Sequence, residues 1–427
     1  MIKSSENNMD NHKHPYYGWY IVISASVICL LTMGMRMGIG PFMEPIMADL
    51  DLSRTELSFI VAIGMIVYGM GMPIAGLLVS TFSTRFMMLT GLTIVCLSIV
   101  GTVSSKGLVS FLLFFGVFLS LGLSFLSNIS FAPIISKWFI RQKGKALFYL
   151  STGGMAGIAI MTPLEMWLIH LVGWQQTLLI FAGVFICIVT PSAIFVMRED
   201  VPKGADSKGT VCKQERQVST DITLRDALKT KAYWQIVLGL FACGFGMNLL
   251  GSHGVPMLMD HGYEPMVASF GIGTIGVVAI FSTIILGQIA DRFPRKNILF
   301  LVYFVRGLGF FGLVLAATNW QLFIVAISGG LVWSGSIAMS TAIISDLFGQ
   351  RLLGILNGWA FFIGHQIAAA LGSFLGGRLY EVFGTHFLSF STAGALAIIA
   401  SLASIRLPQH ISYPKQIKLG EQHNLVK

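Results

Sequence analysis

The sequence predicts an all-α membrane protein whose 12 transmembrane helices form two pseudo-symmetric six-helix bundles. Hydrophobic residues make up 55% of the 427 residues and charged residues only 11%, which is about half the charged fraction of a soluble domain. The chain contains 12 apolar stretches, and each approaches or exceeds the roughly 20 residues that cross a bilayer. Motifs in the two halves recur about 210 residues apart, a pattern typical of membrane folds built from internal repeats.

Short polar segments separate the predicted spans, which together cover most of the chain. The first 17 residues are polar, and the first apolar stretch is too long for the hydrophobic region of a signal peptide. We therefore expect no cleaved leader. The predicted spans are residues 18–46, 56–80, 86–104, 108–136, 145–170, 174–197, 233–258, 265–290, 297–316, 320–346, 352–380 and 385–406.

Basic residues are distributed unequally between the two sides of the predicted membrane. If the N-terminus is cytoplasmic, only Arg54, Lys106 and Arg378 of the 28 Lys and Arg residues fall on the outer side, and Arg36 and Arg306 fall within spans. The others lie on the inner side, as the positive-inside rule requires. We place both termini in the cytoplasm and expect the basic loops to contact anionic membrane lipids, with no nucleic acid as partner.

The longest polar segment divides the chain into two sets of six spans. It covers residues 198–231 and contains Pro, Gly, Ser and many basic residues. We interpret it as a cytoplasmic linker in which residues 223–230 form a short helix. The predicted organisation is an N-terminal cytoplasmic tail at 1–17, a first bundle at 18–197, this linker, a second bundle at 232–406 and a C-terminal cytoplasmic tail at 407–427.

Two pairs of motifs carry the internal repeat. GQIADRFPRK at 287–296 follows the eighth span, and an eroded counterpart, GLLVSTFSTR at 76–85, follows the second. WFIRQKG at 138–144 precedes the fifth span, and FGQRLLG at 348–354 precedes the eleventh. Two such halves imply a pseudo-two-fold axis along the membrane normal, with a binding site at their interface.

The segment 287–296 resembles the loop signature of the major facilitator superfamily, so the resemblance implies the major facilitator fold. In this interpretation Gly287 permits close helix approach, and Asp291 caps a helix and pairs with basic groups of the neighbouring inner loop. Arg292 and Arg295 hold a cytoplasmic gate through ion pairs that break on opening. The superfamily usually works as monomers, so we expect a monomer.

A narrower resemblance, to the monocarboxylate-transporter and oxalate/formate-antiporter branch, extends over most of the chain. That branch carries small organic anions by proton symport or anion exchange, so the resemblance implies a secondary active transporter of a mono- or dicarboxylate. Residues 279–283, AIFST, lack the arginine that the monocarboxylate carriers have on helix eight. The resemblance is carried by YGW at 17–19, KWF at 137–139, KGKA at 143–146, PL at 163–164, GW at 173–174 and HGVP at 253–256.

Arg36 is the principal candidate for anion binding. It lies well inside the first span, where an arginine costs on the order of 3 kcal/mol unless it faces water or a counter-charge. It is also within about a residue of the position at which the resembled monocarboxylate carriers have an essential lysine. We interpret Arg36 as an anion anchor in a central cavity. The alternatives are a structural ion pair, with Glu44 as the partner, or a side chain that snorkels outward.

Polar stripes mark spans four, seven and ten, which surround the cavity of the resembled fold together with span one. We expect substrate contacts from Ser124 and Asn128 in span four, Asn248 in span seven, and Trp333 and Ser336 in span ten. The alternative for the serines is helix packing. The asparagines favour a wet cavity, because an amide needs hydrogen-bond partners within the membrane.

Several ionisable residues allow more than one interpretation. His365 in span eleven is a candidate for a second cationic or proton-carrying group, since imidazole titrates near neutral pH; a neutral histidine bonded to a neighbouring helix fits equally well. Glu165 and His170, near the outer end of span five, fit either a site where protons enter from outside or an ordinary interfacial pair. We interpret Arg306 in span nine as either a structural residue or a contact to lipid headgroups, and Asp260 in the seven–eight loop as solvated.

No catalytic, metal-binding or nucleotide-binding motif is visible, so we expect neither enzyme activity nor a cofactor. The five cysteines show no CxxC spacing, which is typical of packing residues rather than a disulfide framework. The rival hypothesis is a proton-driven multidrug efflux pump, which the 21 Met and 32 Phe favour and the scarcity of carboxylates within spans disfavours. The short tails favour a bacterial inner membrane.

Overall fold

The computed structural model confirms an all-helical membrane architecture. Twelve helical segments are long and apolar enough to cross a membrane, and the described part of the chain contains no β-strand. The described residues are 16–139, 142–200, 223–290 and 293–408.

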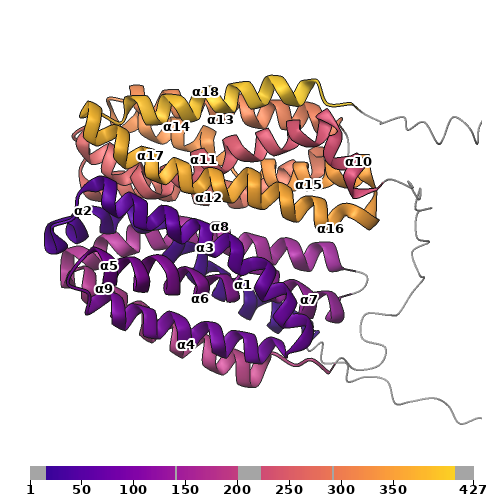
Figure 1. Ribbon diagram of the computed structural model, residues 1–427, viewed down its shortest axis with the longest axis horizontal. Coiled ribbons are helices and arrows are strands. Elements are labelled where there is room, and N and C mark those ends of the chain that lie inside the picture. The colour runs from indigo at the N-terminus through magenta and orange to yellow at the C-terminus, as the bar shows by residue number, and fades with distance from the viewer. Residues whose placement is uncertain (1–15, 140–141, 201–222, 291–292, 409–427) are drawn as a thin grey trace, which may run out of the picture.

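The first six spans form one bundle, drawn from indigo to magenta in Figure 1. Their buried apolar side chains pack mainly against one another and make a core that belongs to this bundle. The elements are α1 (Gly18–Met37), α2 (Ile39–Leu50), α3 (Arg54–Thr81), α4 (Thr84–Val103), α5 (Leu108–Phe111), η1 (Leu112–Leu119), α6 (Ser120–Phe125), α7 (Asn128–Trp138), α8 (Lys143–Val172), α9 (Trp174–Pro191) and η2 (Ser192–Val196).

The last six spans form a second bundle with a hydrophobic core of its own, coloured from salmon to yellow in Figure 1. The short helix expected at 223–230 is confirmed as α10, which the Thr223 side chain caps. The elements are α10 (Leu224–Lys229), α11 (Lys231–Asp260), α12 (Pro265–Ala290), α13 (Arg295–Leu315), α14 (Asn319–Leu331), α15 (Gly335–Phe348), α16 (Gln350–Trp359), η3 (Ala360–Gln366), α17 (Ile367–Phe383) and α18 (Phe387–Ile405).

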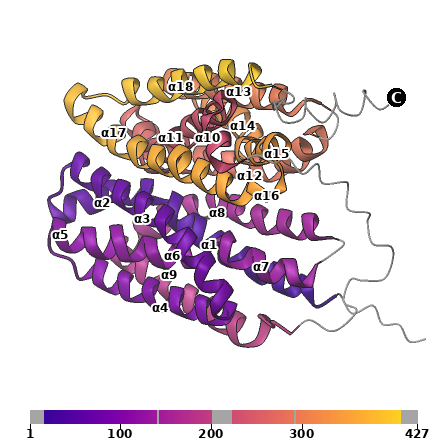
Figure 2. The same cartoon turned by 45° about the vertical axis from the view of Figure 1, so that its right-hand side comes forward.

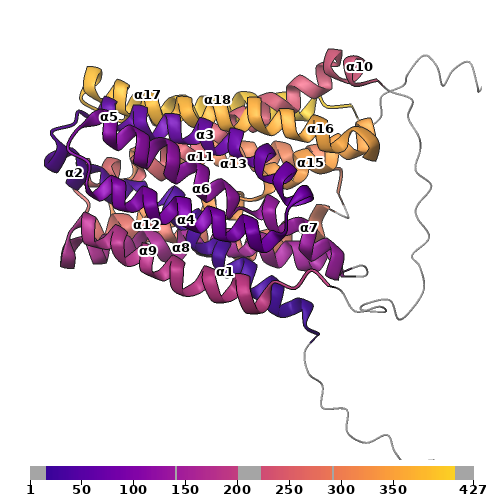
Figure 3. The same ribbon diagram turned by 60° about the horizontal axis from the view of Figure 1, so that its bottom comes forward.

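The spanning helices run roughly parallel to the long axis of the molecule, as Figure 3 shows. α10, the end of α7 and the start of α16 lie together at the right of Figure 1, and we call this the linker end. The opposite end, where α2 and the turn between α17 and α18 lie, is called the far end.

The two bundles meet mainly toward the far end. They touch through α2 with α11, α3 with α17, and α8 with α12. Glycines permit this approach: an ideal Cβ on Gly40 would lie 3.2 Å from Gly251 O, and one on Gly276 would lie 2.5 Å from Ala159 N. At the linker end, by contrast, α7 packs against α1, α3 and α8, whereas α15 and α16 pack within the second bundle (Figure 2).

Several spans are interrupted, which hydrophobic periodicity alone does not predict. Span one breaks at Gly38 between α1 and α2, span four at residues 126–127, and span ten at residues 332–334. Spans four and eleven also contain the π-helical segments η1 and η3. Each interruption frees backbone groups that must be satisfied inside the protein.

Arg306 satisfies the carbonyl groups at the break in span ten. It lies on α13 and is only 3% exposed, and its Nη2 donates to Val332 O at 2.9 Å and to Trp333 O at 2.6 Å. Ser282 of α12 donates to Gly330 O, 3.0 Å away. The structural interpretation of Arg306 is confirmed, because its charge serves the C-terminal end of α14.

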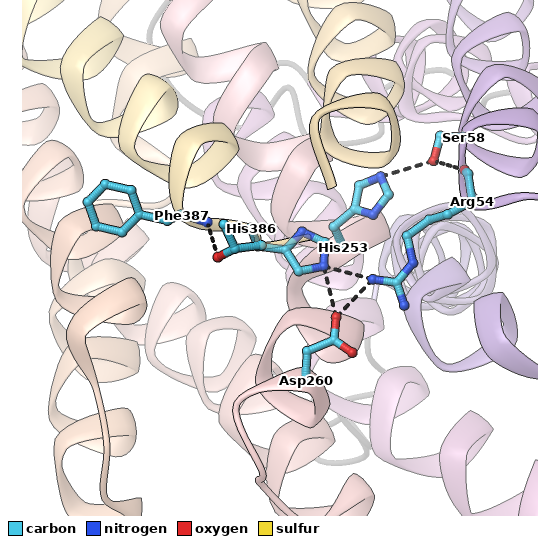
Figure 4. A network of polar contacts seen from close by, with 7 residues as sticks. Arg54, Ser58, His253, Asp260, His386 and Phe387 are labelled. Atoms are coloured by element: carbon cyan, nitrogen blue, oxygen red, sulfur yellow. Dashed lines mark hydrogen bonds and ion pairs between the residues drawn. The ribbon is translucent and has the colours of Figure 1, made fainter. Parts of the chain in front are cut away.

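A polar cluster joins the bundles at the far end, and Figure 4 shows it in close-up. Arg54, at the start of α3, places Nη1 2.8 Å from Asp260 Oδ2 and 2.9 Å from His386 Nε2. The Arg54 guanidinium also lies 3.9 Å from the centroid of the Tyr380 ring. The expectation that Asp260 is only solvated is wrong, because the last residue of α11 meets the first residue of α3 from the other bundle. We call Arg54, Asp260 and His386 the far-end cluster.

Two further contacts reinforce the far-end cluster. His253 is buried, and its Nε2 lies 3.2 Å from Ser58 Oγ of the first bundle and 2.8 Å from Ser373 O of the second (Figure 4 shows the Ser58 contact). The backbone N–H of Thr55 donates to Glu381 Oε1 at 2.7 Å. The far end is therefore closed by polar bonds between the bundles as well as by close helix contacts.

The substitution Arg306→Leu is expected to destabilise the fold by about 2–4 kcal/mol, because it leaves buried carbonyl groups at the break without donors. Thermal unfolding in detergent measures the change. Arg406→Leu, which removes an exposed arginine at the end of α18, is the matched control. An equal shift in Tm for both variants would contradict the role assigned to Arg306.

Asp260→Asn is expected to weaken closure of the far end by about 1–2 kcal/mol, since it removes the charge that pairs with Arg54. Spin-label distances between α2 and α17, measured by double electron–electron resonance, report the separated population. Glu264→Gln changes an exposed carboxylate in the adjacent loop and is expected to leave the distances unaltered. Unchanged distances in Asp260→Asn would argue against the ion pair as a closing contact.

Protonation of His386 is expected to weaken closure of the far end. Burial lowers the pKa of His386, while its hydrogen bond with Asp260 acts in the opposite direction. Protonation would remove the acceptor that Nε2 offers to Arg54 and would place a second cation beside it. The closed form therefore loses stability as the pH falls below the ordinary histidine value of about 6.5. The same spin-label distances, measured across this range, should show less separation on acidification in His386→Gln than in the wild type.

Candidate functional site

Arg36 lies at the C-terminal end of α1, in the last turn before the break at Gly38. A cation at this position complements the partial negative charge of a helix C-terminus. The side chain is partly buried. It reaches across the interface between the bundles and contacts α3, α11 and η3.

Neutral groups from both bundles surround the guanidinium of Arg36. Nη2 lies 3.1 Å from Gln366 Oε1 and 3.5 Å from Asn248 Oδ1, and Cζ lies 4.2 Å from the centroid of the Tyr68 ring. Within the described part of the chain no carboxylate pairs with it, Glu44 included, and Nε has no hydrogen-bond partner. The result is a positive charge that is held in place without being neutralised.

A small cavity of about 30 Å³ adjoins the Arg36 side chain. This is room for roughly one or two water molecules, so a carboxylate can reach the guanidinium only after the helices move. The wall is mostly apolar and contains a few polar groups, as is typical of small-molecule sites. The lining includes Arg36, Met65, Tyr68, Phe115, Ser120 and Leu123.

Among the residues predicted to contact substrate, the structure brings Asn248 to Arg36 and places Ser124 and Asn128 elsewhere. The Asn248 amide is oriented, since its Nδ2 donates to Gly244 O at 2.9 Å while Oδ1 faces Arg36. Ser124 packs against Gly71 of α3 and donates to Leu121 O at 2.7 Å. Asn128 is exposed at the start of α7. The position of Ser124 therefore fits the alternative interpretation, in which the serines of the spans serve helix packing.

His365, Ser336 and Trp333 are buried in the second bundle. The His365 ring stacks on Phe361 at a centroid distance of 4.7 Å. Its Nδ1 lies 3.4 Å from Gln366 Oε1, so Gln366 connects His365 to the guanidinium of Arg36. Ser336 Oγ shares a 3.0 Å hydrogen bond with Cys243. Trp333 lines a separate cavity of about 10 Å³.

The residues of the predicted gating loop fall only partly within the described structure. Gly287 lies on α12, whereas Asp291 and Arg292 lie outside the described residues. Arg295 forms an ion pair with Asp346 of α15. This bond stays within the second bundle and attaches the start of α13 to α15, so in this conformation it does not join the two bundles.

Three residues that matter to the geometry were missed or left open by sequence reasoning. Gln366 places an amide in an apolar helix, which is the same signal that selected Asn248, but the adjacent His365 was selected in its place. Tyr68 carries no charge and is hard to distinguish from an ordinary packing aromatic. Glu165 is fully buried with both carboxyl oxygens unpartnered, which does not fit an ordinary interfacial residue.

The described cysteines are free and lie on four different helices, α1, α4, α9 and α11. Cys212 lies outside the described residues. Within the described ranges, no group of three His, Cys, Asp or Glu side chains is placed to hold a metal ion.

Two curated relatives align with nearly the full chain. An uncharacterised transporter of Bacillus subtilis (strain 168), YcxA, is 26% identical over 431 residues, covering 96% of this chain and 99% of YcxA. Monocarboxylate transporter 6 of Homo sapiens is 26% identical over 401 residues, covering 88% of this chain and 79% of the human protein.

Solved structures share the fold at low sequence identity. The crystal structure of a D-xylose–proton symporter covers 92% of this chain and 98% of the symporter, with a TM-score of 0.72 and 16% identity. A bacterial homologue of the human lysosomal transporter Spinster, in an inward-facing and occupied conformation, covers 92% and 97% with a TM-score of 0.69 and 16% identity. The family model of the major facilitator superfamily matches residues 25–373. The chain therefore belongs to the major facilitator superfamily of membrane transporters.

Proposed function

We propose that this protein is a secondary active transporter that carries a small organic anion, a mono- or dicarboxylate, by alternating access. Proton symport or anion exchange supplies the energy. Membership of the superfamily supports a small-molecule cargo, and relatives named as monocarboxylate transporters support an anion. The observation that carries the proposal is the guanidinium of Arg36, which lies between the bundles with no acidic partner among the described residues.

An arginine without a counter-charge is costly at membrane depth and persists where it faces water, a cavity or a substrate. The acceptors around Arg36 are amide oxygens and an aromatic ring, which orient the guanidinium but leave its charge uncompensated. A carboxylate can accept two parallel N–H bonds from a guanidinium. It therefore supplies both the missing charge and the missing hydrogen bonds, which an uncharged cargo does not.

The origin of the neighbouring groups suggests how binding is linked to movement. Arg36 and Tyr68 belong to the first bundle, while Asn248 and Gln366 belong to the second. An anion that takes the place of the amide oxygens changes the bonds that join the two bundles at this level. A ligand shifts a conformational equilibrium only if it makes different contacts in the two conformations, and an anion bound at Arg36 would do so.

The proposed orientation follows from the basic residues. With both termini and the 198–231 linker in the cytoplasm, the far end is the external face, and it is the closed end in this conformation. The near full-length match to a bacterial relative supports a bacterial inner membrane. We propose a monomer, with Asp291, Arg292 and Arg295 contributing to a cytoplasmic gate in the opposite conformation.

Arg36→Ala is expected to reduce uptake of radiolabelled carboxylates into proteoliposomes by about 100-fold or more, because a buried charge-assisted contact is lost. L-lactate and succinate serve as the mono- and dicarboxylate probes. Arg225→Ala removes an exposed arginine of α10 and should leave uptake near the wild-type level. Undiminished anion uptake in Arg36→Ala would reject the proposed site, and wild-type transport of lipophilic drugs in place of carboxylates would favour multidrug efflux.

Gln366→Glu is expected to raise the KM for the same anions by about 10- to 100-fold. The new carboxylate would lie against Arg36 and occupy the position that a substrate anion needs, and like charges repel. Gln321→Glu adds the same charge at the start of α14, where Gln321 forms a capping box with Thr318 that glutamate also supports. This control should leave the KM unchanged. Equal effects of the two substitutions would indicate a general charge effect rather than competition at Arg36.

A further inference from the structure

Glu165 of α8 is buried in a way that ionised carboxylates are not. Its side chain is 0% exposed, and it is the only acidic residue among the described ranges that is fully buried. Neither Oε1 nor Oε2 has a hydrogen-bond partner. The groups that neutralise or solvate a carboxylate elsewhere in proteins are therefore missing from its contacts.

The carboxyl group rests against the break in the first span. An ideal Cβ on Gly38 would lie 1.7 Å from Glu165 Oε2, so only a glycine at this position leaves room for the acid. Arg36 precedes Gly38 by two residues, and residues at that spacing lie on opposite faces of a helix. The anion anchor and the buried acid thus occupy two sides of the same helix end.

The elements packed around Glu165 carry few charges. α8 contacts α1, α2, α7, α9 and α12, and the basic residue of α7, Lys137, lies in the last turn of that helix, at the linker end. α9 and α12 contain no Asp, Glu, Lys, Arg or His, and of these residue types α1 supplies only Arg36. On α2 the acidic residues are Glu44 and Asp49, and on α8 itself His170 is exposed five residues further on. None of them forms an ion pair with Glu165.

An isolated carboxylate charge in this environment would cost several kcal/mol, whereas the neutral acid avoids most of that penalty. The closed far end therefore encloses Glu165 in its protonated form. The residue before Gly38, Met37, lies at the bundle interface, where its Sδ is 3.0 Å from the position of an ideal Cβ on Gly251 of α11. Closing this interface and protonating Glu165 are consequently linked.

We propose that Glu165 is the proton-binding site of this carrier, so that the far end closes only when its carboxyl group holds a proton. This inference rests on the proposed function. It selects proton–anion symport over anion exchange, because the loaded protein then carries Arg36 paired with a substrate anion and a neutral Glu165. One proton and one monocarboxylate enter together, and no unpaired charge crosses the membrane.

The first test reads the protonation state directly and needs no substrate. Infrared difference spectra between the wild type and Glu165→Gln, recorded on purified protein at neutral pH, should contain the C=O stretching band of a protonated carboxylic acid. Glu44→Gln, which alters a partly exposed acid on α2, should give no such band. Absence of the band from the Glu165→Gln spectrum would overturn the inference.

The second test separates coupling from binding. A gradient of one pH unit can support about a tenfold accumulation by a one-proton symporter. Wild-type proteoliposomes should accumulate L-lactate about tenfold when the outside is more acidic by one unit. Glu165→Gln mimics the neutral acid and should keep lactate counterflow within about twofold of the wild type, while losing its response to the gradient. A preserved response in Glu165→Gln would overturn the inference while leaving anion transport established.

The two tests also distinguish this inference from the function on which it rests. If the infrared band is present but the wild type transports neither L-lactate nor succinate, the anion proposal is rejected and Glu165 is retained as a proton-binding site. Thermal unfolding of Glu165→Gln should match the wild type, because a neutral side chain of the same shape replaces a neutral acid. A marked loss of Tm would show that Glu165 is buried in its charged form and would contradict the proposal.

Discussion

Hydrocarbon provides no hydrogen-bond partners, so every polar group inside the membrane must find its partner within the protein. This constraint accounts for three features of the structure. Arg306 donates to carbonyl groups that the interruption of span ten releases. Arg36 has amide oxygens for orientation but no acidic partner within the described ranges. Glu165 has no partner at all and is inexpensive to bury only as a neutral acid. The first arrangement serves the backbone through Nη2, although Nε and Nη1 of Arg306 have no hydrogen-bond partner. The other two lack the partners that a substrate and a proton can supply.

Hydropathy predicted the spans well, because a bilayer requires a minimum apolar length whatever the details of side-chain packing. The eighth span, expected at 265–290, is α12 at Pro265–Ala290. The interruption at Gly38 was not predicted, since a single glycine in a long apolar run does not reveal whether the helix continues. Asp260 was misjudged for a related reason. Its partner Arg54 lies 206 residues earlier in the chain, and only the assembled bundles bring the two together.

The candidate site could be predicted in part. A charge or an amide inside a span is expensive, so Arg36 and Asn248 stood out in the sequence, and the structure places them in contact. Serines gave no comparable signal, because a hydroxyl can bond to its own helix, as Ser124 does with Leu121. Gln366 and Tyr68 become significant only once the second bundle and α3 are placed beside Arg36. Sequence reasoning therefore located the charge but not the groups that orient it.

The far-end cluster differs from Arg36 in its access to solvent ions. The Asp260 side chain is 25% exposed in its pair with Arg54, so dissolved salt weakens that bond, as it weakens other ion pairs near water. The guanidinium between the bundles is held by neutral groups and is largely sheltered from such screening. Ionic strength on the side of the membrane that the far end faces thus affects how readily that end opens. A change of salinity there would alter the resting distribution of conformations before any solute binds.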